Sequence, residues 1–175
     1  MTLLSPPCDR IYYFAYGSNM HEGRLFERVP SARPIGVGLL RGYRLRWHKK
    51  SKKDGSGKCD IEASGDPDAR VYGVLFEVPL HEKGDLDIVE GLGGGYDEKQ
   101  VEVEVGEGHL RASTYFATKI RANMKPFTWY KAFVVNGARQ HNLPPHYIAF
   151  LQEIEADQDP NTDRHRKNMA LADRF

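Results

Sequence analysis

Strict alternation of valine and glutamate over residues 100–105 constrains the fold of this chain more than any other feature of its sequence. Side chains in a β-strand alternate between the two faces of a sheet, so the three valines share one face and the two glutamates the other. Residues 106–108 (GEG) predict a turn, and the alternation resumes over residues 110–116. We therefore expect an antiparallel hairpin with one buried face.

Further segments with the apolar or alternating character of strands precede this hairpin. They are residues 11–16, 35–47 (one or two strands), 59–63 and 71–78. Residues 65–68 (GDPD) are a turn signal, which predicts that the last two of these segments form a hairpin. The Lys-, Gly- and Ser-rich residues 48–58 are expected to form a polar loop.

Helices are expected where apolar residues recur at helical spacing. The expected helices cover residues 20–29, 79–89, 128–142 and 144–154. Thr128 is a candidate N-cap, and Pro144-Pro145 opens the last helix. After Asp157 the chain becomes polar and charged, which predicts a mobile or loosely docked tail.

The order of these elements is not a regular alternation of strands and helices, which argues against a doubly wound parallel sheet. We expect an α+β fold, with a small mixed β-barrel or strongly curved sheet and flanking helices. A length of 175 residues fits one domain. We assign a lead-in to residues 1–10, the domain to residues 11–156 and a polar C-terminal tail to residues 157–175.

Net charge, cysteine content and the lack of long apolar runs limit the cellular locations and the classes of partner that we expect. The net charge of +1 gives no global attraction to nucleic acid or to an anionic membrane. Cys8 and Cys59 cannot build a disulfide framework, so we expect reduced thiols and a cytoplasmic location. The first ten residues lack the pattern of a signal peptide, and no apolar run approaches the ~20 residues of a membrane span.

Several kinds of site are disfavoured by the motifs. The histidines are scattered and Cys59 has no CxxC partner, so no protein-built metal site is expected. Ser18 lies in YGSNM rather than in the GxSxG elbow of hydrolases. The glycine-rich residues 91–95 lack both a P-loop and a dinucleotide fingerprint. Residues 41–58 carry eight Lys or Arg and one Asp, a local basic patch whose simpler interpretation is a solvated loop.

Two features remain as candidates for chemistry. The Gly17-Ser18-Asn19 turn leads into a helix, where exposed N–H groups favour a carboxylate or a similar anion; a plain helix cap is the alternative. Glu90 ends an apolar helical stretch beside the glycine-rich loop. If it is partly desolvated there, it is a candidate general base with a raised pKa, whereas an ordinary surface glutamate is the alternative.

These features occur together in a known family. Residues 13–20 (YFAYGSNM) resemble the signature strand and turn of the γ-glutamylcyclotransferase family, which includes the AIG2-like proteins. Val89-Glu90-Gly91 followed by Gly95-Tyr96 resembles that family's catalytic-glutamate segment. Residues 126–147 (PFTWYKAFVVNGARQHNLPPHY) resemble its late segment. The likeness covers residues 11–156, and the Lys-rich loop and the tail match no signature.

The resemblance implies a compact mixed barrel and a reaction. In that reaction the α-amine of a γ-glutamyl group attacks its own γ-carbonyl, which releases 5-oxoproline and an amine or amino acid. Because the substrate carries its own nucleophile, no metal or organic cofactor is implied. The expected enzyme is an amide-cleaving lyase or acyltransferase of γ-glutamyl metabolism, with a small-molecule partner and neither a nucleic acid nor a membrane; a homodimer is left open.

The resemblance also implies roles for individual residues. Glu90 would be the general base and then the proton donor to the leaving amine. The Gly17–Asn19 turn would hold the substrate carboxylate or the reacting carbonyl, with help from Ser18. Tyr16 and Tyr96 would form walls of the pocket, and Tyr130 would hydrogen-bond the substrate. A non-catalytic binding module that uses the same pocket is the alternative function.

Overall fold

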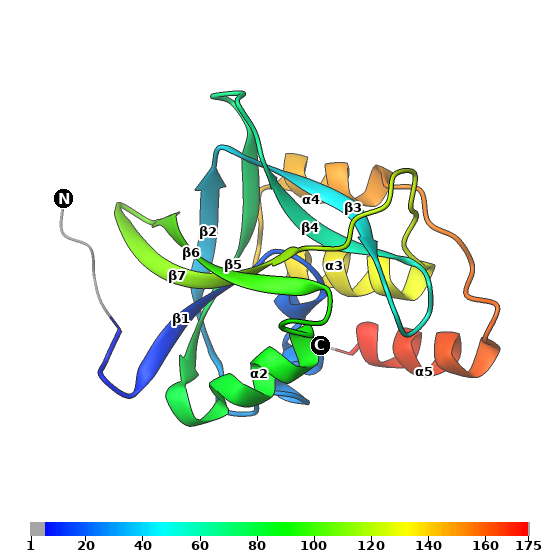
Figure 1. Cartoon of the computed structure of the whole chain (residues 1–175), viewed down its shortest axis with the longest axis horizontal. Helices are drawn as coiled ribbons and strands as arrows, with labels where there is room; N and C mark the ends of the chain where they lie inside the picture. The colour runs from blue at the N-terminus through cyan, green and yellow to red at the C-terminus, as the bar shows by residue number, and fades with distance from the viewer. Residues whose placement is uncertain (1–5, 175) are drawn as a thin grey trace.

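The computed structural model describes residues 6–174 and has a central barrel with helices around it (Figure 1). The strands are β1 (Arg10–Ala15), β2 (Arg33–Arg41), β3 (Tyr43–Lys50), β4 (Gly57–Ala63), β5 (Arg70–Pro79), β6 (Tyr96–Val105) and β7 (Gly108–Ala117). The α-helices are α1 (Glu22–Phe26), α2 (Lys83–Glu90), α3 (Thr128–Gln140), α4 (Pro145–Glu153) and α5 (Thr162–Ala172). Two 3-10 turns, η1 (Ser18–Met20) and η2 (Leu80–Glu82), precede α1 and α2.

Five strands close the barrel in the order β1–β5–β2–β6–β7, which confirms the expected α+β class with a small mixed barrel. The β6–β7 hairpin predicted from the alternation is present, and Val103 lies opposite Leu110. Antiparallel pairs form most of the barrel, whereas β1 and β7 run parallel and meet at Tyr13 and Ser113. Closure therefore brings the first strand of the chain beside the last one.

Glycines of two neighbouring strands leave space for the Phe14 ring inside this barrel. A Cβ at Gly73 of β5 would lie 2.7 Å from Phe14 Cε2 and 2.4 Å from the carbonyl oxygen of Ala15. A Cβ at Gly38 of β2 would lie 2.6 Å from Val103 Cγ1 and 3.1 Å from Phe14 Cε2. All four distances are shorter than van der Waals contact, so only glycine fits at these positions without a shift of the neighbouring atoms.

Two expectations for the central strands were wrong. Residues 59–63 do not form a hairpin with residues 71–78; β4 instead pairs with β3 in a separate two-stranded ribbon. Residues 48–58 are not one loop, because β3 continues to Lys50 and β4 begins at Gly57. Lysine and glycine have a low intrinsic propensity for β-strands. The backbone hydrogen bonds between β3 and β4 override this local preference.

The helices α3 and α4 confirm the two helices expected after the barrel, with one correction. Phe127, rather than Thr128, is the N-cap of α3, and Thr128 is already the first helical residue. Helix α3 lies directly against η1, since a Cβ at Gly137 would be 2.6 Å from the backbone nitrogen of His21. This close approach places the turn after β1 between the barrel and α3.

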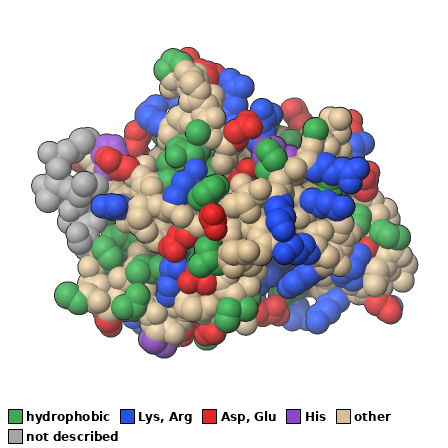
Figure 2. Space-filling model, viewed as in Figure 1, with side chains coloured by type: hydrophobic (Ala, Val, Ile, Leu, Met, Phe, Trp, Pro, Cys, Tyr) green, Lys and Arg blue, Asp and Glu red, His purple; other side chains and the backbone are tan. Residues whose placement is uncertain are grey.

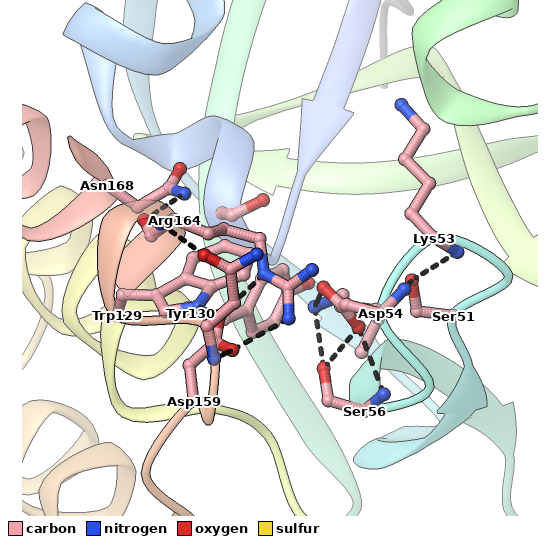
Figure 3. Close-up of polar contacts among 12 residues, drawn as sticks. Ser51, Lys53, Asp54, Ser56, Trp129, Tyr130, Asp159, Arg164 and Asn168 are labelled. Carbon is pink, nitrogen blue, oxygen red and sulfur yellow. Dashed lines mark hydrogen bonds and ion pairs between the residues drawn. The ribbon is translucent and has the colours of Figure 1, made fainter. Parts of the chain in front are cut away.

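Residues 157–174 are not the mobile or loosely docked tail that their polarity suggested. Residues 162–172 form α5, which packs against α3 and α1. Asp159, which is 1% exposed, accepts hydrogen bonds from Trp129 Nε1 at 2.8 Å and from Arg164 Nε at 2.6 Å (Figure 3). A buried carboxylate with these partners ties α5 to α3, and composition alone does not reveal such a pairing.

Within residues 6–174, every helix is too short or too polar to cross a membrane. The boundaries proposed at residues 10/11 and 156/157 stay predictions.

Candidate active site

An inner cavity of about 30 Å³ lies where β1 ends and runs into η1. All seven residues singled out in the sequence line it: Tyr16, Gly17, Ser18, Asn19, Glu90, Tyr96 and Tyr130. Tyr13, Cys59 and Tyr115 complete its lining. The fold thus brings together residues from β1, η1, β4, α2, β6, β7 and α3 that are up to 117 positions apart (13 to 130).

Glu90 is the last residue of α2, and its side chain points into this cavity rather than into bulk solvent. Gly91 ends the helix in the left-handed conformation, with φ of 74°, and its N–H bonds back to the carbonyl groups of Asp87 and Ile88. Tyr13 Oη donates to Glu90 Oε1 at 3.0 Å, and Asn19 Nδ2 donates to the same oxygen. The carboxylate is therefore held by two donors from the first motif.

The Asn19 side chain contacts the Glu90 carboxylate and helps to fix its position. Its Nδ2 also lies 3.2 Å from Tyr13 Oη, and its Oδ1 accepts from Arg28 Nη1 at 3.0 Å. The Arg28 contact fixes which end of the Asn19 amide faces the carboxylate, because the guanidinium can only donate. These contacts make the Asn19 side chain a group that positions Glu90, and the expected role of Asn19 in substrate binding stays a prediction.

The environment shifts the pKa of Glu90 upward. Burial of the carboxylate is the largest cause, because a charged group loses hydration in the cavity. Arg28, the Tyr13 hydroxyl, Arg24 and Lys49 act in the opposite direction and limit the increase. A carboxyl group with a raised pKa holds a proton more readily, which suits a group that takes up a proton and later returns it.

The turn that follows β1 supplies backbone donors to the same cavity. Met20 N and His21 N bond to the carbonyl groups of Gly17 and Ser18, but among residues 6–174 no acceptor pairs with the N–H groups of Ser18 or Asn19. They are the first N–H groups of a helical turn, which have no partner within the turn itself. They are available to a carbonyl oxygen or a carboxylate.

Glycine is required at position 17 by the close packing of the cavity wall. A Cβ there would lie 3.0 Å from Cys59 Cβ and 3.3 Å from Tyr130 Oη. Ser18 is 8% exposed, and its Oγ accepts a hydrogen bond from Arg24 Nε at 3.1 Å. Because the serine has no adjacent base, its hydroxyl is set up to bind rather than to attack.

The tyrosines surround the backbone of Cys59. Tyr96 Oη donates to the Cys59 carbonyl oxygen at 2.7 Å, and Tyr130 Oη accepts from the Cys59 N–H at 3.1 Å. Tyr130 Oη also hydrogen-bonds the side chain of Cys59. Tyr16 Oη donates to the Tyr115 carbonyl oxygen. Burial raises the pKa of the Cys59 thiol, which argues for an inert structural cysteine.

Sequence reasoning missed three residues of this site. Tyr13 contacts Glu90 directly, Arg28 orients Asn19, and Tyr115 forms part of the wall. Tyr13 was within the quoted motif, but its partner is 77 positions away, so only the folded chain shows the contact. Arg28 lies in the turn after α1 (Glu22–Phe26), and a spacing of nine residues from Asn19 carries no recognisable signal.

The basic run of residues 41–58 is partly neutralised. Arg41, Arg44 and Arg46 pair with Glu104, Asp66 and Glu62, and Lys58 pairs with Asp54. This leaves Lys49, Lys50, Lys52 and Lys53, gathered around the end of the β3–β4 ribbon. Lysine and arginine side chains gather on the corresponding face in Figure 2. Within residues 6–174 no group of three His, Cys, Asp or Glu side chains is arranged to hold a metal ion.

Comparison with known proteins identifies relatives of this chain. Residues 70–151 match the model of the AIG2-like family. Human γ-glutamylcyclotransferase is 30% identical over 156 residues, covering 86% of this chain and 81% of the relative, and the bovine protein is 30% identical over 160 residues, covering 87% and 83%. A solved structure described as a γ-glutamyl cyclotransferase superposes with a TM-score of 0.81 at 28% identity, covering 90% of this chain and 99% of the other.

These relatives confirm both the family and the type of enzyme that the motifs predicted. The identity extends over most of both chains. The chain belongs to the γ-glutamylcyclotransferase family.

Proposed function

We propose that this protein is a γ-glutamylcyclotransferase whose general base is Glu90. The observation that carries the proposal is the shared cavity: Glu90, oriented by Tyr13 and Asn19, lines the same space as Ser18 and Asn19, whose N–H groups have no acceptor among the described residues. Intramolecular cyclisation of a γ-glutamyl group needs these two functions, a proton acceptor and a site for negative charge, close together.

The first step is removal of a proton from the substrate's α-ammonium by Glu90. The freed amine attacks the γ-carbonyl carbon, the new C–N bond closes a five-membered ring, and negative charge develops on the carbonyl oxygen. The N–H groups of Ser18 and Asn19 donate to that oxygen. When the tetrahedral centre collapses, the bond to the leaving nitrogen breaks and Glu90 gives its proton to that nitrogen. Glu90 then takes the surplus proton of the ring nitrogen, which leaves the neutral lactam, and passes it to the released amine.

Proximity supplies much of the acceleration in this scheme. The nucleophile and the electrophile are in one molecule, so the enzyme has to fold the glutamyl arm until the amine meets the carbonyl. We propose that Tyr16 and Tyr96 form the walls against which the arm folds, and that Tyr130 hydrogen-bonds the substrate.

We further propose that the protein works in the cytoplasm on γ-glutamyl compounds, without a nucleic acid, a metal or an organic cofactor. The nucleophile and the leaving group both come from the substrate, so the scheme has no step for a cofactor. A homodimer is compatible with the scheme, and sedimentation velocity of the purified protein distinguishes one copy from two.

The test is a panel of γ-glutamyl compounds assayed by mass spectrometry for 5-oxoproline, with Glu90→Gln beside the parent protein. We expect product that scales with enzyme concentration, and a loss of at least about 100-fold in the variant. If the compounds raise the melting temperature of the parent but yield no product, the protein is the non-catalytic binding module. If Glu90→Gln is as active as the parent, Glu90 is not the base.

A further inference from the structure

A second cavity, of about 270 Å³, adjoins the inner one and shares Ser18, Glu90, Tyr96 and Tyr130 with it. The remaining part of its lining is strongly cationic. The basic side chains there are Arg24, Arg28, Lys49, Lys52, Lys53 and Lys58. Glu90 is the one carboxylate among the described residues that line it. Any part of a substrate that extends outward from Glu90 therefore enters a cationic space.

Three lysines in this outer cavity form no ion pair among the described residues, although Glu90 and Asp54 attract Lys49 from a greater distance. Lys58 is paired with Asp54 at 2.9 Å, and Arg24 and Arg28 bond to Ser18 Oγ and Asn19 Oδ1. Among residues 6–174, no carboxylate lies within ion-pair distance of Lys49, Lys52 or Lys53. Because like charges in one cavity repel, their proximity points to an anionic ligand.

The turn between β3 and β4 holds these lysines at the mouth of the cavity. Lys49 Nζ lies 4.7 Å from the centre of the Tyr96 ring, and Lys52 Nζ lies 3.7 Å from the position that a Cβ of Gly94 would occupy. The glycine-rich loop after α2 therefore leaves room for both ammonium groups. Burial lowers the pKa of Lys49, so this ammonium gains from a nearby negative charge.

Asp54 is on the same turn, but both of its carboxylate oxygens are bound by Ser56 and Lys58 and form no ion pair with Lys49, Lys52 or Lys53. Its Oδ1 accepts from Ser56 N and Oγ, and its Oδ2 accepts from Lys58 Nζ. Lys53 N donates to Ser51 Oγ at 3.2 Å, and the Lys53 side chain extends away from Asp54 (Figure 3). Lys52 and Lys53 of this turn therefore line the outer cavity, while Asp54, the acidic residue of the turn, is paired with Lys58.

We infer that the outer cavity selects γ-glutamyl donors whose leaving group is an acidic amino acid, with two carboxylates. This inference rests on the proposed function and specifies its substrate. In a donor bound with its γ-carbonyl beside Glu90, the departing portion lies in the outer cavity. A leaving amino acid with a neutral side chain brings one carboxylate there, whereas an acidic one brings a second to the three unpaired ammonium groups.

The sharpest test compares γ-glutamyl-glutamate with γ-glutamyl-glutamine, which have nearly the same shape and differ by one charge. We expect kcat/KM for 5-oxoproline formation to be roughly tenfold higher for γ-glutamyl-glutamate, since each exposed ion pair contributes up to about fivefold. The preference should weaken at high ionic strength, because the lysines are solvent-accessible. A ratio at or below one in the parent protein would overturn the inference.

Variants locate the source of this preference. In Lys52→Gln/Lys53→Gln the ratio should fall toward one, and Lys49→Gln should lower it further. Lys50→Gln is the matched control: Lys50 follows Lys49 on β3, is exposed, and is absent from the cavity lining because neighbouring side chains in a strand face opposite ways. An unchanged ratio in the double variant, or an equal fall in Lys50→Gln, would contradict the assignment.

A binding measurement separates this inference from the proposed function. If no compound yields 5-oxoproline, the proposed function fails, but calorimetric titration of both dipeptides still reports on the outer cavity. A lower Kd for γ-glutamyl-glutamate that depends on Lys52 and Lys53 would support the cavity's preference, and equal Kd values would refute it. Turnover of both dipeptides at the same rate would refute the preference alone and leave the proposed reaction standing.

Discussion

Tyr13 donates its hydroxyl proton to Oε1 of Glu90 at 3.0 Å, across 77 positions of sequence. The contact joins the first strand of the barrel to the end of α2, and it does so inside the cavity that we propose for catalysis. Because the hydroxyl stabilises the ionised carboxylate, it opposes the effect of burial on the pKa of Glu90. Tyr13 is thus a positioning residue with a measurable electrostatic effect.

Tyr13→Phe should move the acid limb of the pH profile of kcat/KM to higher pH. Removing the hydroxyl deletes a donor that favours the charged form of Glu90, so the pKa of the base rises further. At neutral pH we expect roughly tenfold lower kcat/KM, the order of a lost hydrogen bond to a charged group. Tyr12→Phe, on the opposite face of β1, is the control, and an unshifted acid limb in Tyr13→Phe would contradict the proposed electrostatic role.

Glu90→Gln should abolish turnover and yet resist unfolding better than the parent at alkaline pH. The pKa of Glu90 is raised in the folded protein, so the unfolded chain ionises first as pH increases. The parent therefore loses stability from about pH 4.5 upward until Glu90 is ionised in the fold as well. The melting temperatures of the two proteins should diverge over this window in favour of the variant; a parallel pH dependence would show that Glu90 is not desolvated.

His21 should make stability decline as pH falls below about 6.5. Its ring is fully buried, with Nδ1 accepting from Arg24 N and Nε2 3.0 Å from the Ala172 carbonyl oxygen. Burial lowers its pKa, so below the unfolded-state value the unfolded chain binds the proton first and is favoured.

His21→Asn keeps an acceptor for Arg24 N and removes the titrating group. We expect a loss of about 1–2 kcal/mol at pH 7.5 and a shallower decline in acid, measured by urea unfolding at several pH values. His81→Asn is the control, because the His81 side chain is 79% exposed. If the free energy of unfolding of His21→Asn falls as steeply in acid as that of the parent, the acid sensitivity comes from another residue.

Gly73→Ala should destabilise the barrel by about 1–3 kcal/mol, since the new methyl group would collide with the Phe14 ring and the Ala15 carbonyl oxygen. Gly84→Ala offers a matched contrast. Gly84 lies within α2, where a Cβ would meet no atom within 4 Å, so alanine should stabilise the protein by about 0.5–1 kcal/mol. Denaturant midpoints of the two variants should therefore move in opposite directions.

Local sequence pattern predicted the elements whose periodicity or turn residues lie within the segment itself. The alternation of residues 100–105 and 110–116 predicted the β6–β7 hairpin, and Pro144-Pro145 predicted the start of the last barrel-flanking helix. Prediction from local pattern was wrong for residues 59–63, which pair with β3 rather than β5. A strand with one polar face can pair with either neighbour, and barrel closure decides between them.

Sequence by itself determined the motif of residues 13–20, the glutamate after an apolar helix, and the family to which both belong. Only the tertiary structure decided that Tyr13 and Asn19 hold Glu90, that α5 docks through Asp159, and that Lys49, Lys52 and Lys53 face an outer cavity. The reason is physical. Periodicity and turn chemistry act over a few residues, whereas a pKa or a binding preference arises from charges that closure of the barrel brings together.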